Sequence, residues 1–255
     1  MTDIGYPMVA VIVLGSGVLA GVFAWLARRL VPIDVLKSHH EVGSAVFLQI
    51  GVVFAVMLAF VFSEVWSEYN SAQSAMDQEC GALNGIVMLS AALPEPARQT
   101  IKPALAAYVG QVLHAEFPSM LKRDVSPSAE DAFQALWMAA ATLPAQTAIE
   151  TTIRGQIMSL LNTAHQSRDI RLFLMIRSVP PLLWLLLISF VIVLIGFLLC
   201  FGVDYIVSQV LFTGIFGGCM AFILMMVQLL DFPFEGALRL PSTAFEQTIQ
   251  KIAGM

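Results

Sequence analysis

The fold is decided by residues 45–78, which read AVFLQIGVVFAVMLAFVFSEVWSEYNSAQSAMDQ. The segment begins as an apolar run and becomes polar after residue 62, and it contains no glycine or proline from residue 52 onward that would end a helix. Its polar half still contains good helix formers. We therefore predict one continuous helix, which crosses a membrane over residues 42–62 and then projects from the bilayer into water.

One face of this predicted helix changes character along its length when residues are placed at 100° intervals. An apolar constriction can gate a channel by excluding water, whereas hydroxyl and amide groups can line a wet cavity. We predict a pore neck at Val52, Val56 and Phe60, and a pore cavity lined by Gln49, Ser63, Ser67, Asn70, Ser74 and Gln78. Taken alone, the periodicity favours a second interpretation, helix packing, because membrane helices place small residues at their interfaces.

Three further stretches are long enough to cross the hydrocarbon core, which takes about 20 apolar residues. They cover residues 8–27, 180–203 and 206–230, and none of them contains an acidic or basic side chain. Of the 255 residues, 58% are hydrophobic and 12% are charged, against about 25% charged in soluble domains. The net charge of −5 provides no basic surface for nucleic acid. The composition predicts an integral membrane protein and excludes an ordinary cytosolic enzyme.

Residues 68–178 carry more than half of the charged residues and show no alternating strand pattern. Three apolar runs at helical spacing are predicted to face a core: Leu105, Val109, Val112 and Leu113; Phe133, Leu136 and Trp137; and Ile149, Ile153, Ile157, Leu160 and Leu161. We predict an all-α membrane protein with a 2 + 2 arrangement of four transmembrane helices. Residues 1–67 hold transmembrane helices 1 and 2 (about 8–27 and 42–62), 68–178 a helical extramembrane domain, 179–230 transmembrane helices 3 and 4, and 231–255 a C-terminal tail.

Several short stretches of the sequence carry recognisable local motifs. Residues 51–60, GVVFAVMLAF, are similar to the second transmembrane helix of the bacterial bestrophin family, which reads roughly G-I-A-L-A-I-F-L-G-F. Residues 63–66, SEVW, resemble its S-x-x-Y motif, DFPFEG at 231–236 is similar to its D-P-F-G, and Leu240-Pro241 resembles its later D-L-P. The family's R-W-W-E-A is replaced by EYNSA at 68–72, so its basic residue and its Glu are absent.

The resemblance implies a homo-oligomer, a pentamer around one axial pore with the second helix innermost, in a bacterial inner membrane. It also implies that both termini and the helical domain are cytoplasmic. Loop charges leave the orientation open, because Arg28, Arg29 and Lys37 in the first loop oppose Arg168, Arg171, Arg177 and Arg239 on the other side. With the family's topology, an outer mouth that attracts anions would be lined by Arg28, Arg29, Lys37, His39 and His40. Snorkelling of juxtamembrane bases is the favoured alternative for the two arginines.

No set of residues predicts a metal, a cofactor or a catalytic centre. His39 and His40 are adjacent, so on a helix they point about 100° apart. Asp231 and Glu235 lie where calcium-regulated bestrophins place ligands, but that family's fuller acidic cluster is missing. We expect His114 and Glu116 on a solvated helix face. No nucleophile and base stand at a convincing spacing, so we predict no enzyme activity.

The function predicted from these features is passive ion conduction of the bestrophin type, with anions such as chloride favoured because no acidic residue falls on the pore stripe. A cation-conducting channel is one alternative. The other is a membrane-anchored sensor or scaffold, which would bury residues 63–78 against the helical insert and bind a partner through that insert. The predicted partners are the lipid bilayer, further copies of the chain and the permeant ion, with no nucleic acid.

Overall fold

The computed structural model describes residues 5–33 and 40–254, and within these ranges it is helical with no strand. The elements are α1 (Tyr6–Leu30), α3 (His40–Ser90), α4 (Glu95–Gln111), the π-helical turn η1 (Val112–Glu116), α5 (Phe117–Met120), α6 (Pro127–Ala141), α7 (Ala148–Ile176), α8 (Pro181–Cys200), α9 (Ile206–Leu230) and α10 (Thr243–Ala253). Proline stands at the start of α1, α4, α6 and α8, where its missing N–H has no helical partner to lose. The prediction of an all-α chain is confirmed for the described residues.

Four of these helices, α1, α3, α8 and α9, are long and apolar enough to cross a membrane. The longest is α3, with 51 residues. At 1.5 Å per residue it extends about 77 Å, more than twice the thickness of the hydrocarbon core. The predicted number of apolar spans is therefore confirmed, and the second span continues without a break into the polar half of the same helix.

The chain divides into two compact units. The span unit comprises Thr2–Ser67 and Ser178–Phe232, and it holds α1, α8, α9 and the first part of α3. The polar unit comprises Glu68–Arg177 and Pro233–Met255, with the rest of α3 and the remaining helices. The tail after the fourth apolar helix therefore folds together with the polar insert. The chain passes from one unit to the other within α3, between α7 and α8, and again after α9.

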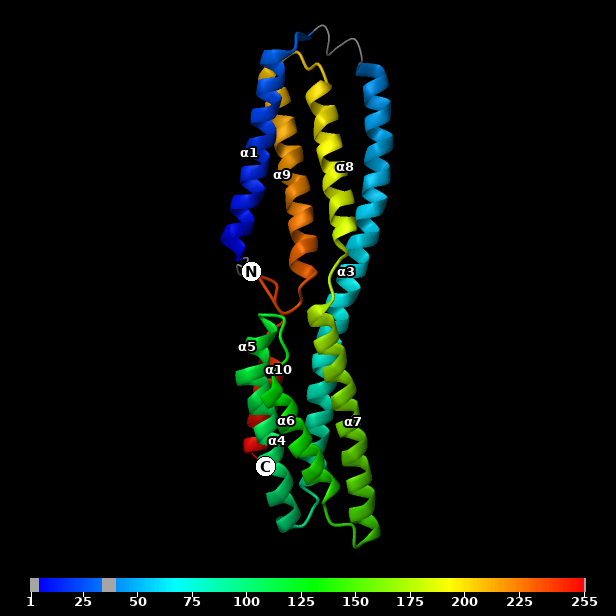
Figure 1. The fold of residues 1–255 in the computed structure, drawn as a ribbon, viewed down its shortest axis with the longest axis vertical. Helices are drawn as coiled ribbons and strands as arrows, with labels where there is room; N and C mark the ends of the chain where they lie inside the picture. The colour runs from blue at the N-terminus through cyan, green and yellow to red at the C-terminus, as the bar shows by residue number, and fades with distance from the viewer. Residues whose placement is uncertain (1–4, 34–39, 255) are drawn as a thin grey trace. The chain divides into compact units, whose positions relative to one another are not determined.

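Within the span unit, α1 and α9 lie side by side and run in opposite directions (Figure 1). Glycines bring the two backbones together, because a Cβ built on Gly17 would lie 2.9 Å from the carbonyl oxygen of Gly214. A Cβ on Gly214 would lie 3.1 Å from the carbonyl oxygen of Gly17. Any larger residue at either position would force the helices apart, which is the usual reason for small residues at membrane-helix interfaces.

The polar unit has its own apolar core. Its fully buried members come from several helices and include Leu83, Ile86, Ile101, Leu105, Tyr108, Leu136, Ile157, Leu161 and Phe245. The C-terminal segment joins this core through Phe234, Leu240 and Ile252, and the Tyr69 hydroxyl donates to the Leu238 carbonyl oxygen at 2.9 Å. At the start of α7, Thr147 and Glu150 form a capping box, which satisfies the free N–H groups of the first turn.

The three predicted apolar faces of the insert are buried or half-buried, with one exception. Ile149 is 72% exposed, so its assignment to the core was wrong. It lies in the first turn of α7, and the buried side chains of that helix begin at Ile153. The spacing that placed Ile149 on the core face is correct, but the helix begins before its packing surface does.

Candidate functional site

The candidate site is one face of α3, and every predicted member of that face is exposed on the chain. In the apolar part, Val52, Val56 and Phe60 are 64%, 50% and 71% exposed. The opposite face of the same stretch is buried, at Phe54 and Val61. The span unit therefore covers one side of α3 and leaves open the side on which the predicted neck residues lie.

The polar part of the face is also exposed, at Gln49, Ser63, Ser67, Asn70, Ser74 and Gln78. Gln78 Nε2 donates to Ser74 Oγ at 3.1 Å, one turn away along the helix. Residues that α3 buries in the polar unit, among them Ala72 and Met76, lie on its other side. The sensor or scaffold alternative required the polar stripe to be buried against the insert, and the structure leaves the stripe exposed.

Carboxylates flank this face, and their surroundings differ. The Glu68 side chain is only 13% exposed and pairs with Arg177, with Nε 2.6 Å from Oε1. Glu64 and Asp77 are exposed. On the helix they lie about 60–80° from the middle of the stripe, by the 100° rule. The stripe itself carries hydroxyl and amide groups, which bind water, and apolar groups, which exclude it.

Of the predicted outer-mouth residues, the structure describes the side chains of Arg28 and Arg29. Arg28 Nη2 lies 3.5 Å from the backbone oxygen of Asp204, and the Arg29 guanidinium lies over the Trp25 ring, 4.3 Å from its centroid. Both contacts are within the span unit and fit the snorkelling alternative. Lys37 and His39 lie outside the described residues, and so does the side chain of His40, whose backbone begins α3.

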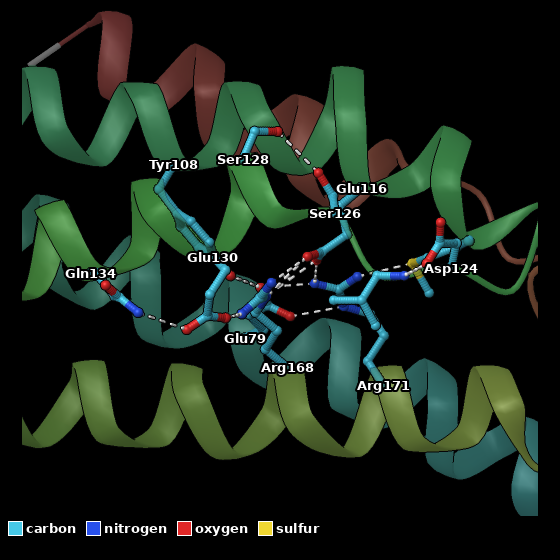
Figure 2. A network of polar contacts seen from close by, with 12 residues as sticks. Glu79, Tyr108, Glu116, Asp124, Ser126, Ser128, Glu130, Gln134, Arg168 and Arg171 are labelled. Atoms are coloured by element: carbon cyan, nitrogen blue, oxygen red, sulfur yellow. Dashed lines mark hydrogen bonds and ion pairs between the residues drawn. The ribbon is translucent and has the colours of Figure 1, made fainter.

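A buried network of charges in the polar unit is the polar feature that the sequence analysis missed (Figure 2). Arg171, fully buried on α7, contacts Glu79 Oε2 of α3 through Nε at 2.9 Å and Glu116 Oε1 through Nη2 at 2.6 Å. Arg168, one turn earlier, contacts Glu116 Oε2 at 2.5 Å and also pairs with Glu130 of α6. The network ties four elements of the polar unit, α3, η1, α6 and α7, together.

The expectation that Glu116 lies on a solvated face was wrong, because this side chain is fully buried between the two arginines. It closes the π-helical turn Val112–Glu116, whose extra residue changes the direction of the side chains that follow. The sequence did contain a signal. Arg168 and Arg171 continue the stripe of Ile157, Leu161 and Ala164 on α7, and bases on a core-facing stripe predict buried carboxylate partners. His114, the other member of that expectation, is exposed.

Burial and neighbouring charges shift the pKa values of Glu116 and Tyr108 in this network. Burial alone raises the pKa of Glu116, but the charges and hydrogen bonds of Arg171 and Arg168 outweigh burial and hold the pKa below its usual value. Burial, together with the charge of Glu79, raises the pKa of Tyr108 well above its usual value, and the Tyr108 hydroxyl donates to Glu79 Oε1 at 2.5 Å. Each carboxylate already has a cationic partner, so this arrangement acts as a structural clamp.

The described residues contain no group of three or more His, Cys, Asp or Glu side chains that could hold a metal ion. The acidic residues after the fourth apolar helix have partners within their own units. Asp231 Oδ1 accepts from the Val179 backbone N–H at 2.8 Å, which fixes the start of α8 to the end of α9. Glu235 Oε1 lies 2.6 Å from Arg123 Nε, beside a turn in which Arg123 has a φ of 57°. Both carboxylates therefore hold neighbouring segments of the chain in place.

Comparison with known proteins identifies the family of the chain. The model of the bestrophin-like domain matches residues 15–245. Among solved structures, a bacterial bestrophin homologue from Klebsiella pneumoniae has a TM-score of 0.73 at 15% identity, with 96% of this chain and 97% of that chain covered. A single-residue variant of a Klebsiella pneumoniae homologue has a TM-score of 0.71 at 16% identity, with 94% and 98% covered.

A further solved structure, described as a membrane protein variant, has a TM-score of 0.74 at 16% identity and covers 95% of this chain and 96% of its own. At these identities the structural likeness establishes the fold alone. No curated protein matches the chain. The match to the family model extends over most of the sequence, with the first apolar helix included from residue 15 onward and the other three in full. The chain is a multi-pass membrane protein that belongs to the bestrophin-like domain family.

Proposed function

We propose that the chain is the subunit of a passive ion channel whose pore is lined by α3. The observation that carries the proposal is the exposed face of this single helix, which is apolar at Val52, Val56 and Phe60 and polar without charge from Ser63 to Gln78. A narrow apolar stretch can close a pore by expelling water, and a wider hydroxyl-lined stretch keeps ions hydrated. Transport is then driven by the electrochemical gradient and involves no covalent chemistry.

We infer that several copies of the chain surround one axial pore, because the exposed stripe of one helix cannot enclose a channel. Symmetric rings are the usual way in which identical subunits close such an assembly. The resemblance to bestrophins favours five copies with α3 innermost. Exposed large side chains on the span unit, among them Leu48 and Phe212, then contact lipid or a neighbouring copy.

We propose that the permeant ion is an anion such as chloride, since none of the nine stripe positions is acidic. The exposed carboxylates of Glu64 and Asp77 favour the competing assignment, cation conduction, because they lie beside the stripe. A salt gradient separates the two assignments: the reversal potential takes the sign of the chloride or of the cation equilibrium potential. We further propose that the protein lies in a bacterial inner membrane, with both termini and an extramembrane domain formed by residues 68–178 in the cytoplasm.

The test is single-channel recording of the purified oligomer in planar lipid bilayers. Phe60→Ala removes the largest side chain of the proposed neck, so we expect larger single-channel current steps than in the parent protein. Leu186→Ala is the matched control, because Leu186 is a half-buried residue of α8 away from the α3 stripe, and its conductance should equal that of the parent. An intact oligomer with no current steps would refute the channel. Equal conductance in all three proteins would refute the neck.

A further inference from the structure

A groove of about 720 Å³ runs along the span unit between α1 and α9. Its floor is made by the glycines that join the two helices, Gly17, Gly21, Gly214 and Gly218. Its walls are apolar side chains that stand up on either side, including Val18, which is 67% exposed. Because the glycines have no side chains, the close approach of the backbones leaves a valley on the outer surface. This volume is in the range of sites that hold a single small ligand.

One end of the groove is cationic. Trp25 lines that end, and the Arg29 guanidinium lies over its ring, 4.3 Å from the centroid. Arg28 adjoins it in the sequence, and in the described part of the chain its hydrogen bond goes to the backbone oxygen of Asp204, at 3.5 Å. Among the described residues, no carboxylate lies within ion-pair distance of either arginine. Trp and Arg at the end of an apolar helix mark the level of the lipid headgroups.

We propose that an anionic phospholipid binds this groove, with one acyl chain along the glycine floor and its phosphate on Arg28 and Arg29. The walls extend along α1 from Leu14 to Trp25, about 16 Å at 1.5 Å per residue, which is the length scale of an acyl chain. Within the described residues, the lining of the groove at the acyl-chain end is apolar, and the two cations at the headgroup end have no carboxylate partner. Guanidinium groups recognise phosphate through paired N–H donors. The inference does not depend on the channel proposal.

The direct test measures binding of two lipids with the same chains to the delipidated oligomer in dodecylmaltoside, by native mass spectrometry. Dioleoylphosphatidylglycerol is anionic, and dioleoylphosphatidylcholine is neutral overall. We expect the anionic lipid to bind more tightly. In Arg28→Gln/Arg29→Gln we expect its affinity to fall about 30-fold, the effect of two basic residues near an anionic headgroup. Arg98→Gln/Lys102→Gln removes the same charge from the polar unit and should bind as the parent does.

A second pair of variants tests the apolar part of the groove. Val18→Trp fills it from an exposed wall position, and we expect weaker binding of the anionic lipid. Val11→Trp is the matched control, since Val11 is 70% exposed on the same helix and does not line the groove. Every variant is first checked for an unchanged oligomer by size-exclusion chromatography. If Val18→Trp does not fold, the arginine variant decides the proposal by itself.

Three results would overturn the proposal. Equal binding of the two lipids would mean that the groove holds only unselective boundary lipid. If inorganic phosphate displaced the bound anionic lipid as effectively as added anionic lipid does, the arginines would bind free anions without the groove. Dissociation of the Val18→Trp oligomer, with the anionic lipid still bound at the parent's affinity, would mean that a second copy of the chain covers the groove.

Discussion

Replacing Arg171 with alanine should destabilise the polar unit more than any loss of a surface charge. The guanidinium is fully buried and joins Glu79 of α3 to Glu116 of η1 through contacts of 2.6–3.2 Å. Among the described residues, removing it leaves Glu79 with the Tyr108 hydroxyl and Glu116 with Arg168 as remaining hydrogen-bond partners. Breaking a buried ion pair from one side costs about 3–5 kcal/mol, because the partner's charge stays buried without compensation. For a chain of this size we expect the thermal midpoint to fall by about 6–20 °C.

The assay is thermal unfolding of the detergent-solubilised oligomer, followed by loss of the oligomer peak in size-exclusion chromatography. Lys122→Ala is the control, because Lys122 is exposed and its loss should change the stability by less than about 0.5 kcal/mol. The thermal midpoint of Arg171→Lys should lie between those of Arg171→Ala and Lys122→Ala. An ammonium group keeps the charge, but it lacks the planar set of N–H donors with which the guanidinium contacts both carboxylates. An Arg171→Ala midpoint equal to that of Lys122→Ala would refute the clamp and the reasoning behind it.

Three further predictions rest on separate features. In a variant without Cys80, Cys200 and Cys219, cysteines at Ser67 and Ser74 should react quickly with a charged thiol reagent, whereas a cysteine at the fully buried Ala72 should react slowly; slow reaction at Ser67 and Ser74 would refute the wet cavity. The lowered pKa of Glu116 stabilises the fold above its ordinary pKa of 4.5, and this contribution is lost as the pH falls through the folded-state value. Thermal midpoints in acid should therefore fall less steeply for Glu116→Gln than for the parent, and parallel curves would contradict this. Gly17→Ala should lower the thermal midpoint because its Cβ would lie 2.9 Å from the Gly214 oxygen, whereas Gly15→Ala, with open space around it, should not; equal midpoints would argue against close α1–α9 packing.

Much of the fold could be predicted from the sequence because the relevant free energies are local. Transfer of an apolar helix into hydrocarbon depends on the composition of about 20 consecutive residues, so the four apolar stretches correspond to α1, α3, α8 and α9. The continuity of α3 from the apolar into the polar stretch follows from the absence of glycine and proline between residues 52 and 78. Helical periodicity placed Val52, Phe60 and Ser74 on one face, and that face is exposed along its length. Its role as a pore lining stays a prediction.

Contacts between distant residues were decided only by the tertiary structure. Glu116 and Arg168 are 52 positions apart, and no local pattern brings their side chains together. Phe245 enters the core of the polar unit from a segment that follows the fourth apolar helix, and the sequence analysis described that segment only as a tail. The groove between α1 and α9 likewise exists because Gly17 meets Gly214, far along the chain. Solvent transfer and helix propensity act on each segment by itself. Ion pairing, core packing and close backbone contact depend on which other segment of the chain packs against it.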